Sequence, residues 1–267
     1  MKIILVTGDK GQLVSCHADL GKHEKILKFI FVDSKELDVT KKEDVSSFLK
    51  NNKIDYCINY CAYTAVDKAE TEKEFVQNIN AKLAQYLAEA SRNNNALFLL
   101  IVTDFVFDGK TSIAYNKDDL TNPLSIYEIT KLNVEIAIAN ATPKHFIIRT
   151  SWLYPEHGNN FLKTMPRLGS EKDKISIVVN QIGTPTYVGD LAELILKIIT
   201  EESFDYGSYH YSNEGVVSWC DFAKAIFDNT QNKVKLNPIK TTAYPNTAKK
   251  HIFIAMDKSK IKNNLSI

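Results

Sequence analysis

The chain has 267 residues, of which 44% are hydrophobic and 24% charged, enough to bury one sizeable core with a smaller lobe attached. Thirty-three basic residues nearly balance thirty-two acidic ones, so the net charge does not predict binding to nucleic acid or to an anionic membrane. The opening run MKIILVTG is too short for the centre of a secretion signal, and no run approaches the ~20 apolar residues of a membrane span. We therefore expect a cytoplasmic protein whose partners are defined by individual sites.

Five short apolar runs have the composition of buried parallel strands. They lie at 2–8, 26–33, 54–62, 96–103 and 144–152. Helical patterns separate them, and the clearest spans 72–95, where Phe75, Ile79, Leu83 and Leu87 recur every fourth position. This alternation predicts an α/β fold, a doubly wound parallel sheet of the Rossmann type, with ligands bound at the carboxyl ends of its strands.

The order of elements is looser after residue 152. The segment 190–202 is patterned as an amphipathic helix, and a second helix is expected to begin at Ser218, which has capping-box spacing to Asp221. We predict a dinucleotide-binding domain at 1–151 and a mainly substrate-binding lobe at 152–267, with 177–206 returning to the first domain.

The four cysteines include a C-x3-C pair, Cys57 and Cys61, inside the third apolar run. A strand would place both on one face, which favours buried free thiols over a metal site.

A glycine turn follows the first expected strand, with Gly8 and Gly11 ahead of the first helix. Glycines at such a turn let a pyrophosphate approach the backbone and the helix N-terminus. Asp33 ends the second strand 22 residues after Gly11, which is the position of an acid that binds an adenosine ribose. The alternative role of Asp33 is capping the turn that follows, and nearby Lys35 leaves binding of a 2′-phosphate open. The pattern predicts NADPH or NADH without choosing between them.

Tyr127 and Lys131 are one helical turn apart, which places them on one face of a helix. Reduction of a ketone needs a proton on oxygen, and a phenol beside an ammonium is suited to deliver it. Thr103, at the end of the fourth strand, adds a hydroxyl. Taken alone, the spacing fits a surface pair equally well.

Several segments together resemble one family. They are TGDKGQL, LDVT, NYCAYTAVDKAE, VTDFVFDG, YEITKLNVE, IRTSWLY, GNNFLKTM, NQIGTPTYVGDLA and GSYHYSNEGVVSWCDFA. From residue 2 to about residue 260 the chain resembles dTDP-4-dehydrorhamnose reductase, an extended short-chain dehydrogenase/reductase. The resemblance implies a reductase that uses NADPH or NADH to convert the 4-keto group of dTDP-4-dehydro-6-deoxy-L-mannose, the last step in making dTDP-L-rhamnose.

The resemblance also assigns residues to roles. Catalysis falls to Thr103, Tyr127 and Lys131, with Tyr127 as proton donor. The cofactor would be bound by Gly8, Gly11, Gln12, Leu13, Asp33, Asp38, Val39, Ala62, Tyr63 and Thr64, together with Tyr127 and Lys131. The dTDP-sugar substrate would be bound by Asp104, Phe105, Trp152, Asn160, Phe161, Gln181 and Lys250.

The chain departs from the family pattern near the glycine turn and the proposed proton donor. Val14 replaces the third glycine, where a side chain must be accommodated between helix and strand. Glu128 and Val134 replace glycines in the segment after Tyr127. We expect Glu128 to point to solvent, since adjacent helical residues face different directions.

Other departures affect ligand binding. Ser15 and Cys16 occupy the region where some relatives have an acid that binds magnesium, so no metal is predicted. Lys250 and His251 stand where the family has arginine-proline, and a lysine does not replace a bidentate arginine.

Two alternatives keep the same fold. One is a nucleotide-binding regulatory or scaffold protein with little turnover, as in the regulatory subunit of methionine adenosyltransferase, which resembles the same family. The other is a reductase or epimerase of another sugar nucleotide. Neither nucleic acid nor membrane is expected as a partner, and a homodimer is compatible with the resemblance.

Overall fold

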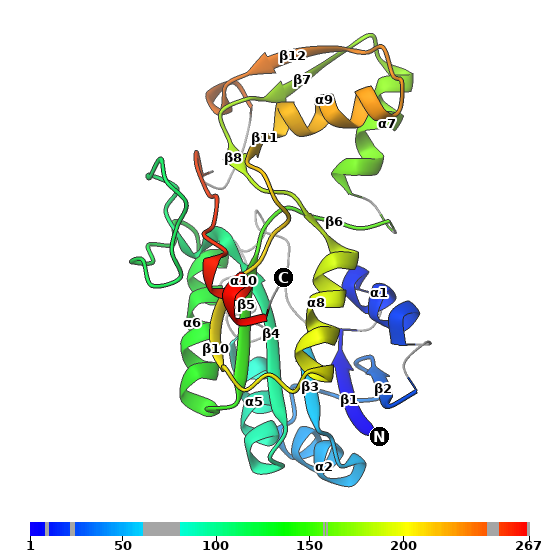
Figure 1. Cartoon of the computed structure of the whole chain (residues 1–267), viewed down its shortest axis with the longest axis vertical. Coiled ribbons are helices and arrows are strands. Elements are labelled where there is room, and N and C mark those ends of the chain that lie inside the picture. Colours follow the sequence, from blue (N-terminus) through cyan, green and yellow to red (C-terminus); the bar gives the residue numbers. More distant parts are fainter. Residues whose placement is uncertain are drawn as a thin grey trace.

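A computed structural model describes residues 1–8, 11–21, 25–60, 81–156, 158, 160–244 and 251–265. Figure 1 shows two parts: a parallel sheet covered by helices in the lower half, and a smaller lobe above it. The carboxyl ends of the central strands lie on the side of the sheet that faces the small lobe.

The main sheet contains six described strands in the order β10-β5-β4-β3-β1-β2. They are β1 Lys2–Thr7, β2 Leu27–Val32, β3 Tyr56–Asn59, β4 Leu97–Thr103, β5 His145–Thr150 and β10 Gly207–His210. Every neighbouring pair is parallel. The predicted doubly wound parallel sheet is therefore confirmed. The strand order reverses between β1 and β3, which is where such sheets bind ligands.

Helices cover both faces of this sheet (Figure 1). One face carries α1 (Gln12–Gly21) and α8 (Val188–Thr200), and the other carries α2 (Lys42–Asn52), α5 (Leu83–Asn93) and α6 (Ile126–Ala141). On β1, Ile4 points into the first core and Leu5 into the second. Because both faces of the strands are buried, their sequences are continuously apolar rather than alternating.

The ends of the helices follow their capping residues. Ser125 caps α6 with Glu128 as the reciprocal partner, and Ser218 does the same for α9 (Trp219–Asn229) with Asp221, as its spacing predicts. In the predicted helix at 72–95, α5 occupies the part that lies within the described residues, ending at the expected asparagines.

The small lobe has its own apolar cluster, centred on Met165, Ile175 and Phe227. It packs α7 (Phe161–Glu171) against α9 and two strands, β7 (Lys174–Val178) and β12 (Lys235–Ile239), which pair in parallel. Four short strands lead in and out of the lobe: β8 (Ile182–Gly183) pairs with β11 (Val217–Ser218), and β6 (Leu153–Tyr154) pairs with β9 (Thr186–Tyr187). The last pair lies between the lobe and α8.

The C-terminal part of the chain comes back to the large domain. Phe253 bridges to Ile182, and Met256 bridges to Tyr115. The final helix, α10 (Ser259–Leu265), packs on β10. The main sheet thus extends past the predicted return at 177–206, because β10 pairs with β5. The division of the chain into two domains stays a prediction.

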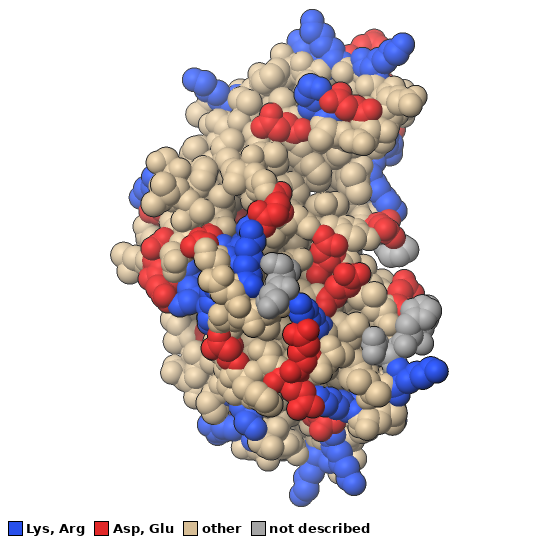
Figure 2. All heavy atoms as spheres, viewed as in Figure 1, with Lys and Arg blue, Asp and Glu red and all other residues tan. Residues whose placement is uncertain are grey.

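Acidic and basic side chains are interspersed on the face shown in Figure 2, in keeping with the near-neutral net charge. Across the described ranges, the helices are too short or too polar to cross a bilayer. Cys57 is a buried free thiol, and Cys61 lies outside the described residues.

Candidate active site

Tyr127 and Lys131 lie in the first two turns of α6, and both side chains are buried. The Lys131 Nζ atom is 5.6 Å from the centroid of the Tyr127 ring. The helix begins at Ile126 because the Ser125 hydroxyl accepts a hydrogen bond from the Glu128 amide. The predicted pair is therefore a buried phenol and ammonium at a well-capped helix start, not a pair on an exposed face.

Thr103 ends β4 and caps the 3-10 turn η2 (Asp104–Val106) that follows. Its hydroxyl accepts a hydrogen bond from the Phe105 amide at 3.2 Å and donates one to Asp104 Oδ1 at 3.0 Å. Turn η2 packs on α6, which brings the end of β4 alongside the helix that carries Tyr127. Capping is one role of Thr103, and its catalytic role stays a prediction.

Asp104 is a buried acid in this turn, and its Oδ2 atom has no hydrogen-bond partner among the described residues. Burial raises the pKa of its carboxyl to about 7, although the hydrogen bond from Thr103 and the charge of His251 act in the opposite direction. Burial also raises the pKa of Tyr127, and the negative charges of Asp104 and Glu128 add to the effect. Titratable groups with raised pKa values therefore gather around the predicted proton donor.

Glu128 does not point to solvent, so that expectation is wrong. Glu128 is only 1% exposed. One carboxylate oxygen accepts hydrogen bonds from the backbone amides of Leu124 and Ser125, and the other lies 2.8 Å from His251 Nε2. The position at the third residue of the helix turns the side chain back toward the cap, where it also meets the C-terminal segment.

In the predicted glycine turn, the structure describes Gly8 and Gly11, and both positions favour glycine. Gly8 adopts a φ of 95°, a conformation that residues with a side chain rarely adopt. The Gly11 amide donates to the Gly8 carbonyl at 3.1 Å, and a Cβ added at Gly11 would lie 3.1 Å from that same oxygen. Gln12 then opens α1, whose N-terminal amides face this turn. The backbone here fits the close approach of a pyrophosphate.

Val14 is accommodated by the core. It is 5% exposed and belongs to the apolar cluster between the sheet and α8. Leu13 is buried in the same cluster, so only its backbone is placed to contact a ligand at the turn.

The other predicted cofactor residues on this side are partly occupied by local hydrogen bonds. Asp33 accepts from the backbone amides of Lys35 and Glu36, so it caps the turn after β2. Asp38 accepts from the amide and the hydroxyl of Thr40. Val39 packs against the second core. Ala62, Tyr63 and Thr64 lie outside the described residues.

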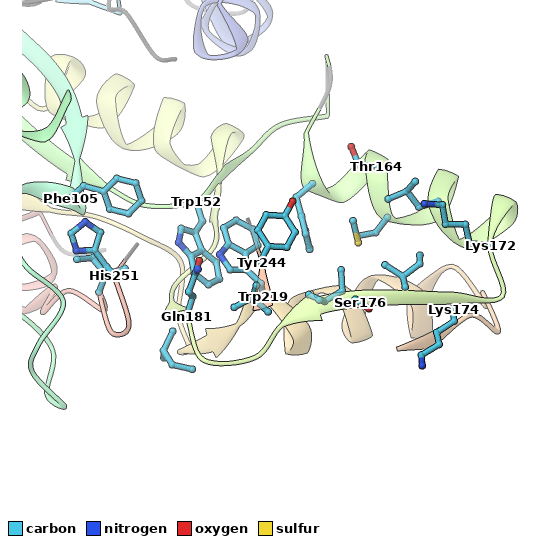
Figure 3. Close-up of a pocket in the computed structure, with 18 residues that line it drawn as sticks. Phe105, Trp152, Thr164, Lys172, Lys174, Ser176, Gln181, Trp219, Tyr244 and His251 are labelled. Atoms are coloured by element: carbon cyan, nitrogen blue, oxygen red, sulfur yellow. The ribbon is translucent and has the colours of Figure 1, made fainter. Parts of the chain in front are cut away.

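A pocket of about 790 Å³ runs from turn η2 into the small lobe. Figure 3 shows Phe105 and His251 together at one end, Trp152, Trp219 and Tyr244 in the middle, and two lysines at the other end. The middle is strongly aromatic: the rings of Trp152 and Trp219 stack with centroids 3.8 Å apart. Such a pocket is suited to a planar base or a sugar face.

Four of the predicted substrate residues, Phe105, Trp152, Phe161 and Gln181, line this pocket. Trp152 has a φ of 44°, an uncommon conformation for a residue with a side chain, and such conformations cluster at ligand sites. Asn160 caps α7 by accepting a hydrogen bond from the Lys163 amide and is not among the lining residues that the structure describes. Lys250 lies outside the described residues. Tyr127 and Lys131 do not belong to the described lining; their helix contacts turn η2, whose Phe105 lines the pocket, and its Glu128 pairs with His251.

Among the other lining residues, Trp219, Tyr244 and His251 carry rings and received no role from the sequence. Trp219 directly follows the helix cap at Ser218, and an aromatic residue at that position of a lobe helix is a signal that could have marked it as a pocket residue. Tyr244 follows a 3-10 turn with no pattern around it. His251 stood out only as a departure from the family. Within the described ranges, no three His, Cys, Asp or Glu side chains are grouped to hold a metal ion. The prediction that the protein binds no metal stays a prediction.

Comparison with known proteins adds the family. The family model described as the RmlD substrate binding domain matches residues 1–267. A dTDP-4-dehydrorhamnose reductase from Aggregatibacter actinomycetemcomitans is 40% identical over 277 residues, covering 100% of this chain and 94% of that relative. The chain belongs to the dTDP-4-dehydrorhamnose reductase family.

Two solved members of the family share the fold of this chain over nearly its whole length. The dTDP-4-dehydrorhamnose reductase from Clostridium acetobutylicum matches with a TM-score of 0.93 at 38% identity, covering 98% of this chain and 92% of that one. The enzyme from Bacillus anthracis, solved in complex with NADP, matches with a TM-score of 0.92 at 37% identity, covering 99% and 93%. The predicted family and fold class are confirmed, and these relatives are reductases of the oxidoreductase class that the sequence predicts.

Proposed function

We propose that the protein reduces the 4-keto group of dTDP-4-dehydro-6-deoxy-L-mannose to give dTDP-L-rhamnose, with NADPH or NADH as reductant and Tyr127 as proton donor. The observation that carries this proposal is the family match over residues 1–267, which spans both the Tyr127 helix and the pocket of the small lobe. The reductase name of a relative that is 40% identical over the full chain supports the substrate.

The dinucleotide would be held at the glycine turn and by Asp33, with the nicotinamide directed toward the carboxyl ends of β3 and β4. The φ of 95° at Gly8 and the tight approach of a Cβ added at Gly11 to the Gly8 carbonyl support this site, because a dinucleotide turn needs glycine where the backbone meets the pyrophosphate. When bound, the reduced cofactor supplies the hydride that goes to the carbonyl carbon. NADP in the Bacillus anthracis relative supports this class of cofactor.

Tyr127 would give its phenolic proton to the carbonyl oxygen, so that the C=O double bond is replaced by new C–H and O–H bonds. Because burial and two nearby acids raise its pKa, the phenol stays protonated at neutral pH and is available as a donor. The phenolate left behind needs a positive charge. The Lys131 ammonium, 5.6 Å from the ring centroid, supplies it.

The substrate would place its sugar at the end of the pocket near turn η2 and its thymine among the aromatic rings. Thr103 and Asp104 then offer a hydroxyl and a carboxyl close to the reacting group. Trp152, stacked on Trp219, offers an apolar wall. Gln181 lines the same wall and donates a hydrogen bond to the Thr241 hydroxyl, which fixes its amide.

The test is turnover with defined substrates. Purified protein is given the dTDP-linked 4-keto sugar with NADPH or NADH, and the product is identified by mass as the ketone plus two hydrogens. We expect stoichiometric cofactor oxidation with this substrate and none with dTDP-glucose, which has no keto group. Calorimetry measures binding in parallel. Binding of both ligands without turnover would reject the reductase in favour of a scaffold, and turnover only with another nucleotide's sugar would reject the dTDP-linked substrate.

A further inference from the structure

A buried ion pair joins the C-terminal segment to the helix that carries the proposed proton donor. His251 Nε2 lies 2.8 Å from Glu128 Oε1, and the two side chains are 3% and 2% exposed. The two residues lie 123 positions apart in the sequence and meet only in the fold.

His251 is fixed from two further sides. Its ring stacks on Phe105 in turn η2, with centroids 4.9 Å apart and planes at 24°. On the other side it lies against Gly109, where an added Cβ would come within 2.7 Å of His251 Cβ. Gly109 has a φ of 71°, so the turn favours glycine on two counts. One imidazole thus contacts the turn after β4, the start of α6 and the loop between them.

The charge of this pair acts on the site. Burial alone would lower the pKa of His251, but the hydrogen bond and the negative charge of Glu128 outweigh burial and raise it. Glu128 and Asp104 are the two acids whose charges raise the pKa of Tyr127. A protonated His251 lies beside both, so it offsets the charges that make Tyr127 a weaker acid.

We propose that Glu128 and His251 are positioning residues of the reaction: the pair locks the C-terminal segment onto the Tyr127 helix and neutralises Glu128 beside the proton donor. His251 also lines the pocket next to Phe105, so the same contact joins the substrate end of the site to the proton-delivery end (Figure 3). The inference rests on the proposed reductase activity and adds two residues to it.

The groups that act on the pKa of His251 or of Tyr127 define what a pH profile would report. The charges of Glu128 and Asp104 act on both, and the backbone of Asp108, beside Gly109, also raises the pKa of His251. Asp108 has a lowered pKa of about 2 and stays ionised at neutral pH. The His251 charge is therefore present at lower pH and is lost as pH rises through its raised pKa. We expect kcat/KM to fall along that alkaline limb.

The experiment compares wild type with His251→Gln, Glu128→Gln and the double variant in the reductase assay. His251→Gln keeps a hydrogen-bond donor but leaves Glu128 buried and unneutralised. We expect it to lower kcat roughly tenfold, a part of the ~100- to 10,000-fold that a positioned acid contributes. The double variant should regain at least about threefold of that loss, because it removes the unpaired charge. In Glu128→Gln, the alkaline limb should move to lower pH, since His251 loses the partner that holds its proton.

Glu135→Gln is the matched control. Glu135 lies two turns further along α6, is 5% exposed and pairs with buried Arg149. It should lower the thermal midpoint without moving the alkaline limb.

The outcomes separate the inference from the proposed function. Wild-type protein with no turnover rejects the function itself. If wild type is active and His251→Gln has an unchanged kcat and pH profile, the inference is overturned and the function stands. It is also overturned if the double variant is slower than both single variants, because that is the result of lost packing alone. The inference is supported if kcat recovers in the double variant and the alkaline limb of its pH profile is absent.

Discussion

The two ends of the site are built from different chemistry. At the η2 end, Asp104, Tyr127 and Glu128 are buried together, and the pKa values of Asp104 and Tyr127 are raised. In the small lobe the pocket is walled by Trp152 and Trp219, half-buried rings without titratable groups. The first end concentrates charge in a low-dielectric setting, and the second offers apolar area.

This contrast predicts a division of labour. Buried ionisable groups change rates because proton transfer depends on their pKa values. Stacked aromatic rings change affinity because their contacts with a bound base are the same before and during the reaction. Substitutions at the η2 end should therefore act on kcat and on pH dependence, and substitutions in the lobe should act on KM.

The largest effect is expected for Tyr127→Phe. It removes the proposed proton donor and keeps the ring, so kcat should fall by roughly 100- to 10,000-fold with little change in KM. Initial rates of cofactor oxidation measure it. Tyr115→Phe is the control, since Tyr115 is a buried phenol whose hydroxyl donates to Asp108 at 2.8 Å, outside the proposed machinery. A Tyr127→Phe enzyme with a wild-type kcat would remove the proton donor from the mechanism.

The next effect is on stability and comes from Asp104. Its folded pKa of about 7 lies above the ordinary 3.8, so its folded form keeps a proton that the unfolded chain releases. The contribution of Asp104 to the free energy of unfolding is therefore fully present below about pH 3.8 and decreases as pH rises toward 7. Asp104→Asn should abolish that decrease and raise the free energy of unfolding near pH 7.5 by at most about 4 kcal/mol, at about 1.4 kcal/mol per pKa unit.

Urea unfolding at several pH values measures this difference. Asp108→Asn gives the opposite sign, because the pKa of Asp108 is lowered to about 2 by its hydrogen bonds from Tyr115 and Asn122 despite the opposing effect of burial. Its contribution is present above pH 3.8 and is lost as pH falls through 2. Identical pH profiles for wild type and Asp104→Asn would contradict the buried acid.

A smaller effect, on affinity, is expected for Trp219→Ala. It removes the ring stacked on Trp152 and should raise KM for the sugar nucleotide roughly 5- to 100-fold, in line with ~1–3 kcal/mol per stacked base. The change in kcat should stay within about threefold. Phe204→Ala, at a side chain that is 70% exposed, controls for loss of an aromatic residue. A fall in kcat at constant KM would contradict the claim that the small lobe acts on affinity and the η2 end on rate.

The smallest effect is expected at the outer end of the pocket. Lys172 and Lys174 line it but are exposed, so water and salt screen their charges. The double variant Lys172→Met, Lys174→Met should raise KM about threefold or less at physiological ionic strength and leave kcat unchanged. Steady-state kinetics at low and high salt measure this, and a tenfold rise would show that the substrate diphosphate is bound at this end.

Much of the large domain was predictable from local patterns. The apolar runs of β1 and β4 specify strands buried on both faces, Gly8 specifies a turn after β1 that favours glycine, and Ser218 with Asp221 specifies a helix start. Each of these depends on contacts within a few residues or on a period that the sequence displays. The spacing of Tyr127 and Lys131 belongs here too, since one helical turn fixes their common face.

The sequence by itself determined the parallel sheet, the glycine turn after β1 and the position of Tyr127 and Lys131 on one face of a helix. The tertiary structure alone decided the direction of Glu128, the role of His251 and the pocket walls at Trp219 and Tyr244. A residue's local pattern fixes which element it joins, whereas its partner is fixed by elements that meet in space. Glu128 turned inward because the C-terminal segment supplies His251 at 2.8 Å, and no local pattern around Glu128 contains that contact.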